Sequence, residues 1–206
     1  MSFNYLTVIE IKRKFPNVKV YIHLHSKFPF LATENNAVTY IQKCLNNGVE
    51  IIFNHRSALM SFPVKGCHYL PNVYSFKISN TENNVVRNEN ELNIGCHGSM
   101  RHMKNQIIQA VAACRLAKDL NKKLIFHVNS SRDDGEKSSI LSSIDQIVSM
   151  NGGQLAHSPW LEHSNFISYV KNLDLGMQVS LCETFNLVAA DYVTAGIPLV
   201  VSAQIS

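Results

Sequence analysis

The sequence predicts an α/β fold made of two Rossmann-like domains, each built on a parallel β-sheet. Short apolar runs of strand length alternate with segments of helix length along most of the 206 residues, a pattern typical of right-handed βαβ units. One polar segment over residues 78–91, rich in Asn and Glu, interrupts this alternation and has the composition of a linker. We therefore expect an N-terminal domain over residues 1–77 and a C-terminal domain over residues 92–206.

Before the linker, apolar runs predict three strands, at residues 18–25, 49–54 and 67–70. A helix is expected over residues 35–47, because Gly48 follows it and glycine readily adopts the left-handed conformation that ends a helix. A short helix or turn should separate the second and third strands. The basic run from Lys12 to Lys14 is interpreted as a solvated helix end rather than as a binding patch.

After the linker, five strands are predicted at residues 92–97, 123–128, 154–157, 174–179 and 198–202. The helices expected between them cover residues 105–120, 138–150, 162–170 and 185–195. The first of these helices has apolar residues at positions 107, 108, 111, 112, 116 and 117, the spacing of an amphipathic helix. Ligands of such sheets bind beyond the carboxyl ends of the strands, near the point where the strand order reverses.

Composition narrows the class of function. Hydrophobic residues make up 46% of the chain and charged residues 17%, as in soluble globular proteins. The net charge of +4 suits a small anionic ligand but is too small and too scattered to predict a nucleic-acid partner. The N-terminus has the pattern of neither a signal peptide nor a membrane span. We expect a cytoplasmic protein, and leave open a peripheral place at a membrane.

The cysteines and histidines do not predict a metal site. The five cysteines are dispersed, without a C-x-x-C pair, and are typical of small core residues in a reducing compartment. His23 and His25 lie two apart on a predicted strand and would share a face, but no third ligand is evident nearby. We therefore expect no bound metal.

The loop after the strand at residues 92–97 carries the first candidate site. Gly98 permits a close approach of the backbone to a ligand, and a helix follows whose free N–H groups and dipole favour an anion. Arg101 offers a planar fork for phosphate oxygens, and Lys104 adds a compact positive charge. The alternative is that both cations only decorate a solvated helix start.

The second candidate loop follows the strand at residues 174–179. Glu183 precedes a predicted helix and lies at the ligand edge of the sheet, where a carboxylate can accept hydrogen bonds from sugar hydroxyls. Asp191 lies about two helical turns further along and could bind a ribose diol. The alternative interpretation is that Glu183 only caps the helix, worth about 0.3–1 kcal/mol, and that Asp191 is solvated.

The run ETFNLVAADYVTAGIPLVVS closely resembles the donor-site motif of glycosyltransferase family 4, whose members have the GT-B fold. That motif has two acids separated by seven residues, followed by a glycine, a proline and an apolar strand. The second acid is usually Glu, whereas this chain has Asp191. The segment GSMRHMKNQ resembles the family's basic diphosphate loop. The resemblance covers most of residues 92–206 and is weaker over residues 18–76.

The resemblance implies a retaining glycosyltransferase that needs no metal or cofactor and uses a nucleotide-diphosphate sugar as substrate. Arg101 and Lys104 would neutralise the leaving diphosphate, Glu183 would bind donor-sugar hydroxyls, and Asp191 would bind the ribose. Main-chain amides around Thr184, Phe185 and Asn186 would contact sugar and phosphate. His25 matches the place of a cleft histidine in many relatives, although a histidine at a strand end is often structural.

Relatives of this family are longer, so the resemblance implies that the N-terminal domain is partial and that the last elements of the C-terminal domain are missing. A partner chain or self-association would then complete the domains. The acceptor, a saccharide, a lipid or a protein, is left open. Two alternatives remain: a non-catalytic nucleotide-sugar-binding or interaction subunit with the same fold, and a sugar-nucleotide enzyme of similar architecture such as an epimerase.

Overall fold

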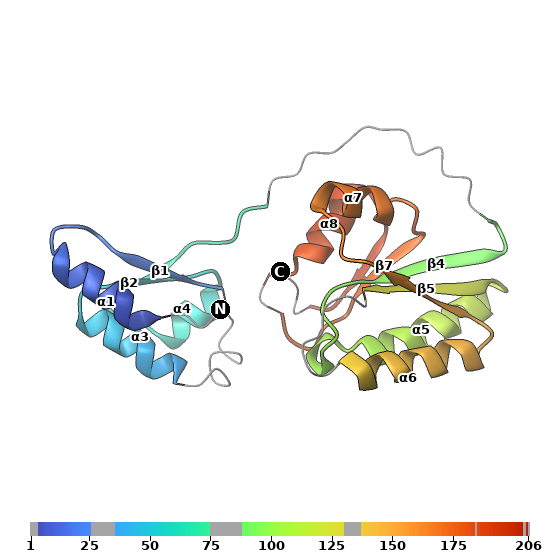
Figure 1. The fold of residues 1–206 in the computed structure, drawn as a ribbon, viewed down its shortest axis with the longest axis horizontal. Coiled ribbons are helices and arrows are strands. Elements are labelled where there is room, and N and C mark those ends of the chain that lie inside the picture. Colours follow the sequence, from blue (N-terminus) through green and yellow to red (C-terminus); the bar gives the residue numbers. More distant parts are fainter. Residues whose placement is uncertain are drawn as a thin grey trace. The chain divides into compact units, whose positions relative to one another are not determined.

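The computed structural model describes residues 4–25, 36–74, 88–129, 137–183, 185–203 and 205. The chain divides into two compact units, residues 1–73 and residues 74–206, and each is described by itself (Figure 1). Of the predicted linker, residues 78–87 lie outside the described residues. Glu91, its last residue, already begins the first strand of the second unit.

The first unit is a three-stranded parallel sheet with the order β1-β2-β3. Its elements are α1 (Tyr5–Lys14), β1 (Tyr21–Leu24), α3 (Ala37–Asn46), β2 (Glu50–Phe53), α4 (Arg56–Ser61) and β3 (Cys67–Tyr69). The central strand supplies Ile51 and Phe53 to a buried apolar core. The basic run predicted to be a helix end forms the last turn of α1, where cations are favourable against the helix dipole.

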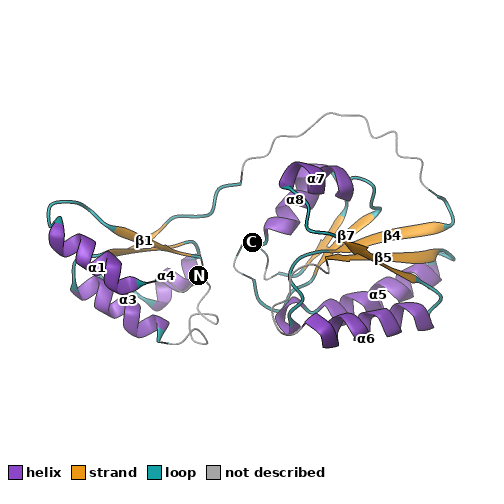
Figure 2. Cartoon of the chain, in the orientation of Figure 1, coloured by secondary structure: helices purple, strands orange, loops and turns teal. Residues whose placement is uncertain are grey.

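The second unit is a five-stranded parallel sheet with helices on both faces (Figures 1 and 2). Its strands are β4 (Glu91–Cys96), β5 (Lys123–Asn129), β6 (Gln154–Ser158), β7 (Leu175–Gln178) and β8 (Leu199–Val201). Its helices are α5 (Gln106–Asp119), α6 (Lys137–Met150), α7 (His163–Val170) and α8 (Leu187–Ala195), and a 3₁₀ turn, η1 (His102–Lys104), precedes α5. The predicted α/β fold with parallel sheets is confirmed.

The strand order of the second unit is β6-β5-β4-β7-β8. The chain runs outward from β4 to β6 and then returns to the other side of β4 with β7, so the order reverses between β4 and β7. Helices α5 and α6 cover one face, and α7 and α8 cover the other (Figure 1). The loops after β4 and β7 therefore emerge side by side, where ligands of doubly wound sheets bind.

The buried face of α5 differs from the face that its large apolar residues predict. Among the described residues of this helix, those that are buried are Gln106, Gln109, Ala110, Ala113, Cys114 and Ala117. Ile108 and Val111 are instead exposed. Small side chains on the inner face allow the helix to pack closely, and the two glutamines find hydrogen-bond partners there. Apolar periodicity predicted the helix correctly, but it predicted the wrong side of the helix to be buried.

On the opposite face, Tyr192 of α8 packs across the junction of β4 and β7. Gly95 and Gly176 are paired in register on these two strands, and the Tyr192 side chain lies against both. A Cβ atom on Gly95 would clash with the Tyr192 hydroxyl and would lie 2.5 Å from Leu173 Cδ1. The two glycines therefore allow α8 to approach the sheet closely at the strand-order reversal.

Candidate functional site

The candidate site lies at the carboxyl ends of β4 and β7, where two loops meet. One loop, residues 97–105, runs from β4 through η1 to α5, and the other, residues 179–186, runs from β7 to α8. The backbone N–H of Leu181 in the second loop donates to the carbonyl of Met103 in the first at 2.9 Å. The two loops, distant in sequence, are therefore directly joined.

An ion pair between Lys104 and Glu183 forms the centre of this site. The Lys104 side chain is 18% exposed and the Glu183 side chain 8%, so both charges are largely withdrawn from water. Gly98 lies beside them, because a Cβ atom there would be 3.9 Å from Lys104 Nζ and 3.9 Å from Val188 Cγ2. Its φ of +110° is a conformation that favours glycine. The structure thus brings together Gly98, Lys104 and Glu183.

Neighbouring hydroxyls fix the orientation of Glu183. Ser180 Oγ donates to Glu183 Oε1 at 3.0 Å, and Ser202 Oγ donates to the Ser180 carbonyl at 2.7 Å. Burying two charges has a desolvation cost that the pair must offset, and an apolar pair of the same size is often at least as stable. A buried ion pair at the reversal point of the sheet is therefore more typical of a functional site than of a device for stability.

Arg101 begins the turn that leads to Lys104. Its backbone N–H donates to Gln106 Oε1 at 3.2 Å, which fixes the start of η1. Its side chain is exposed, unlike that of Lys104. The two predicted cations thus lie in different environments, one at the surface and one beside Glu183.

Asn186 caps the N-terminus of α8. Its Oδ1 accepts from the Ala189 N–H at 3.0 Å, and its Nδ2 donates to Gln178 Oε1 at 2.9 Å. Phe185 is half-buried, and its ring centroid lies 6.4 Å from that of Tyr74. Thr184, which was predicted to contribute a main-chain amide, lies outside the described residues.

Asp191, in the second turn of α8, is buried rather than solvated. It accepts hydrogen bonds from the Tyr74 hydroxyl and from His163 Nε2, the latter at 2.7 Å. Burial, followed by the hydrogen bond to Asp191, raises the pKa of Tyr74 to about 12. Asp191 therefore belongs to a cluster with Tyr74 and His163, two residues that sequence reasoning did not identify.

His25 belongs to the first unit, where it follows β1. Its Nδ1 lies 3.0 Å from Asn72 Oδ1, and its ring centroid lies 4.4 Å from that of His23. The predicted sharing of one strand face by these two histidines is confirmed by this contact. In the described part of the chain, no three His, Cys, Asp or Glu side chains gather closely enough to hold a metal ion.

Two histidines of the second unit, the buried His97 and the half-buried His127, contact tyrosine hydroxyls. His97 Nδ1 and the Tyr192 hydroxyl are 2.6 Å apart, and His127 Nδ1 and the Tyr169 hydroxyl are also 2.6 Å apart. Burial lowers the pKa of His97 to about 3 and that of His127 to about 4. Both imidazoles are therefore neutral near pH 7 and act as hydrogen-bonding core groups.

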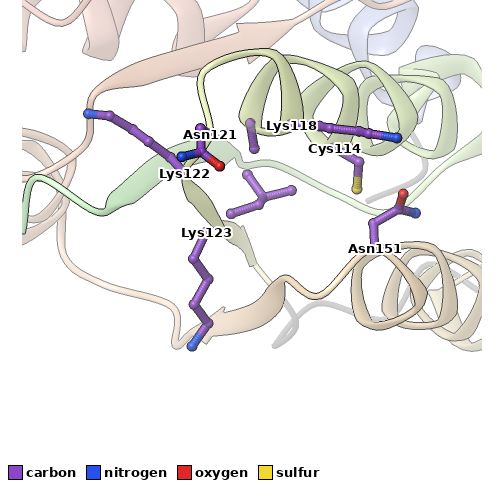
Figure 3. A pocket seen from close by; sticks show the side chains of 8 residues that line it. Cys114, Lys118, Asn121, Lys122, Lys123 and Asn151 are labelled. Carbon is purple, nitrogen blue, oxygen red and sulfur yellow. The ribbon is translucent and has the colours of Figure 1, made fainter.

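A hollow of about 320 Å³ lies at the opposite edge of the same sheet (Figure 3). Its lining includes Lys118 and Lys122 near the end of α5 and Lys123 at the start of β5. Figure 3 shows these three side chains pointing away from one another, so their charges do not converge on one ligand. Among the residues that the structure describes, no helix is long and apolar enough to cross a bilayer.

Comparison with known proteins gives structural matches but no match at the level of sequence. No protein-family model matches the chain, and no curated protein matches it. Among solved structures, the chain is similar to OtsA in its apo form, with a TM-score of 0.73 and 14% identity, over 98% of this chain and 56% of that one. The N-terminal domain of Candida albicans trehalose-6-phosphate phosphatase gives a TM-score of 0.73 and 12% identity, over 98% and 54%.

A third similar structure is Anabaena HepE in complex with UDP and glucose, with a TM-score of 0.67 and 17% identity, over 98% of this chain and 58% of that one. This chain spans a little over half the length of the structures it matches. At these identities the likeness concerns the fold. The two units have the Rossmann-like α/β fold of GT-B proteins.

Proposed function

We propose that this chain binds a nucleotide-diphosphate sugar at the carboxyl edge of its five-stranded sheet and transfers the sugar to an acceptor with retention of configuration. The observation that carries the proposal is the ion pair between Lys104 and Glu183. A cation for a diphosphate and a carboxylate for sugar hydroxyls come from two loops and meet at the reversal point of the sheet.

In the proposed reaction, the two charges of this pair interact with different parts of the donor. As the glycosidic bond to the diphosphate breaks, negative charge grows on the leaving phosphate, and a positioned cation in a water-poor site stabilises it. Lys104 is such a cation, since only 18% of its side chain is exposed. On binding, the diphosphate would share Lys104 with Glu183, which frees a carboxylate oxygen for a sugar hydroxyl.

The remaining contacts follow from the resemblance to the donor-site motif. Arg101 would reach the diphosphate from the surface, and main-chain amides at residues 184–186 would contact sugar and phosphate. Asp191 would bind the ribose diol, which requires it to exchange its hydrogen bonds with Tyr74 and His163. A role of His25 in the reaction stays a prediction of the resemblance. Similar structures described with UDP-2-fluoro glucose or with UDP and glucose support a nucleotide-sugar ligand.

Thermal shift with a panel of nucleoside diphosphates and nucleotide sugars tests the binding step. A ligand present at 100 times its Kd should stabilise the folded chain by about 2.7 kcal/mol, which raises Tm by several degrees. Glu183→Ala should weaken the shift from nucleotide sugars more than the shift from the nucleoside diphosphate alone. The absence of any shift across the panel would contradict the proposal.

Product analysis separates transfer from the alternatives. A transferase releases nucleoside diphosphate in step with a glycosylated acceptor. A binding subunit leaves the donor intact, and an epimerase returns an isomerised donor sugar. Reactions with saccharide, lipid and protein acceptors should therefore be assayed both for released nucleoside diphosphate and for isomers of the donor sugar.

A further inference from the structure

The two loops of the candidate site are braced by buried side-chain amides. Gln109 of α5 is 2% exposed, as is Gln178, the last residue of β7. Each uses both ends of its amide in a hydrogen bond to a different segment. A buried amide is costly to leave unpaired, so a glutamine bonded at both ends of its amide fixes the separation of the groups it joins.

Gln109 links the loop of residues 97–105, which carries Lys104, to the end of β7. Its Nε2 donates to the carbonyl oxygen of Lys104 at 2.7 Å. Its Oε1 accepts from the backbone N–H of Val179 at 3.0 Å. One side chain therefore holds the backbone of Lys104 and the first residue of the loop that carries Glu183.

Gln178 joins the end of β4 to the start of α8. Its Nε2 donates to the carbonyl oxygen of His97 at 3.0 Å, and its Oε1 accepts from Asn186 Nδ2 at 2.9 Å. His97 immediately precedes Gly98, and Asn186 caps α8. Gln178 therefore links the same two loops through a second pair of hydrogen bonds.

These amides occupy positions where the fold alone favours apolar residues. Gln109 lies on the inner face of α5 beside Ala110 and Ala113, and Gln178 ends β7, which has a neighbouring strand on each side. We propose that Gln109 and Gln178 are positioning residues, which hold Lys104 and Glu183 at the separation that a diphosphate-linked sugar requires. The ligand part of this inference rests on the function proposed above.

The test uses Gln109→Met and Gln178→Met, which keep the side-chain length and remove the amide. Ile144→Val is the control, since Ile144 is buried in α6 of the same unit and its truncation lowers stability without touching the loops. Hydrogen exchange of the Leu181 amide, which bonds to Met103, reports the joint between the loops without any ligand. Each glutamine variant should lose at least about tenfold protection at Leu181 beyond its change in global stability. The control should lose none beyond that change.

Affinity for a nucleoside diphosphate, measured by calorimetry on folded protein, gives the second readout. Each glutamine variant should bind about tenfold more weakly than the unmodified chain, and the control should bind equally well. In a Lys104→Ala background, Gln109→Met should have little further effect, because it acts through Lys104. Full further loss in that background would show that Gln109 acts independently and would overturn its positioning role.

The two proposals fail in different ways. If the unmodified chain binds no nucleotide but the glutamine variants lose protection at the Leu181 amide, the positioning of the loops is supported and the proposed function is contradicted. If the chain binds nucleotide and both variants bind it equally well, the function stands and the positioning role is overturned. Unchanged protection at Leu181 in both variants would also contradict the claim that these glutamines hold the two loops together.

Discussion

The two edges of the five-stranded sheet both carry lysines, but they differ in what surrounds those lysines. At the amino edge, Lys118, Lys122 and Lys123 line a hollow of about 320 Å³ and point apart (Figure 3). At the carboxyl edge, Lys104 is largely buried and paired with Glu183. Neither a hollow nor a group of cations is therefore sufficient to identify a ligand site. Convergence of opposite charges from separate loops is the more informative feature.

The largest effect should come from breaking the pair on one side only. Lys104→Met leaves Glu183 buried without its cation and should lower the free energy of unfolding by about 3 kcal/mol, measured by urea denaturation. The double variant with Glu183→Gln should recover most of that loss, since no charge is left unpaired. Both variants should bind nucleotide more weakly than the unmodified chain. Equal instability of the single and double variants would contradict the importance of the pairing.

A methyl group at the reversal point of the sheet should have the next largest effect. Gly95→Ala places a Cβ against the Tyr192 hydroxyl and 2.5 Å from Leu173 Cδ1, so α8 must shift away from β4. We expect a loss of about 2 to 3 kcal/mol in the free energy of unfolding, together with weaker nucleotide binding. Unchanged stability in urea denaturation would show that α8 does not depend on this close approach.

Acid should destabilise the carboxyl edge through its buried histidine. The pKa of His97 is lowered by burial from 6.5 to about 3, so below pH 6.5 the unfolded chain binds a proton that the folded chain excludes. Stability present at pH 7 is therefore lost as the pH falls, by about 2 kcal/mol at pH 5 from this residue. His97→Gln should reduce the difference between urea denaturation at pH 7 and pH 5 by about that amount.

The matched control for acid sensitivity is His157→Gln. The His157 side chain on β6 is exposed, so this variant removes an imidazole without removing a buried one. An equal reduction in both variants would mean that the acid sensitivity does not come from burial of His97.

The smallest effect is expected at the amino edge. Lys118→Ala and Lys122→Ala remove exposed cations whose charges do not converge, and each should change stability by no more than about 0.5 kcal/mol. Neither should change nucleotide affinity measured by calorimetry. A loss of affinity comparable to that of Lys104→Ala would move the candidate anion site to this edge and would contradict the comparison.

Element types and their order followed from the sequence, because local periodicity records them. The strands predicted at residues 123–128 and 154–157 became Lys123–Asn129 and Gln154–Ser158, and the helix ending before Gly48 ends at Asn46. The strand at residues 18–25 is shorter, Tyr21–Leu24. Ends are less certain than types because they depend on tertiary hydrogen bonds as well as on the residues themselves.

Side-chain environments were harder to predict. The inner face of α5 holds Gln109 rather than Ile108, because a glutamine with two partners on neighbouring loops can replace an apolar residue. Asp191 gave no sign in the sequence of its contacts with Tyr74 and His163, which lie far away along the chain. Polar residues on the sheet-facing side of a helix were the one available signal, and large apolar neighbours obscured it.

The parallel α/β fold and the candidates Lys104 and Glu183 could be predicted from the sequence, because strand and helix periods and the turn residues are local properties. The contact between these two charges, the exposure of Arg101 and the hydrogen bonds of buried amides between the loops could be seen only in the folded chain. The physical reason is that strand order and helix rotation set which distant side chains become neighbours. Both are fixed by packing over the whole sheet.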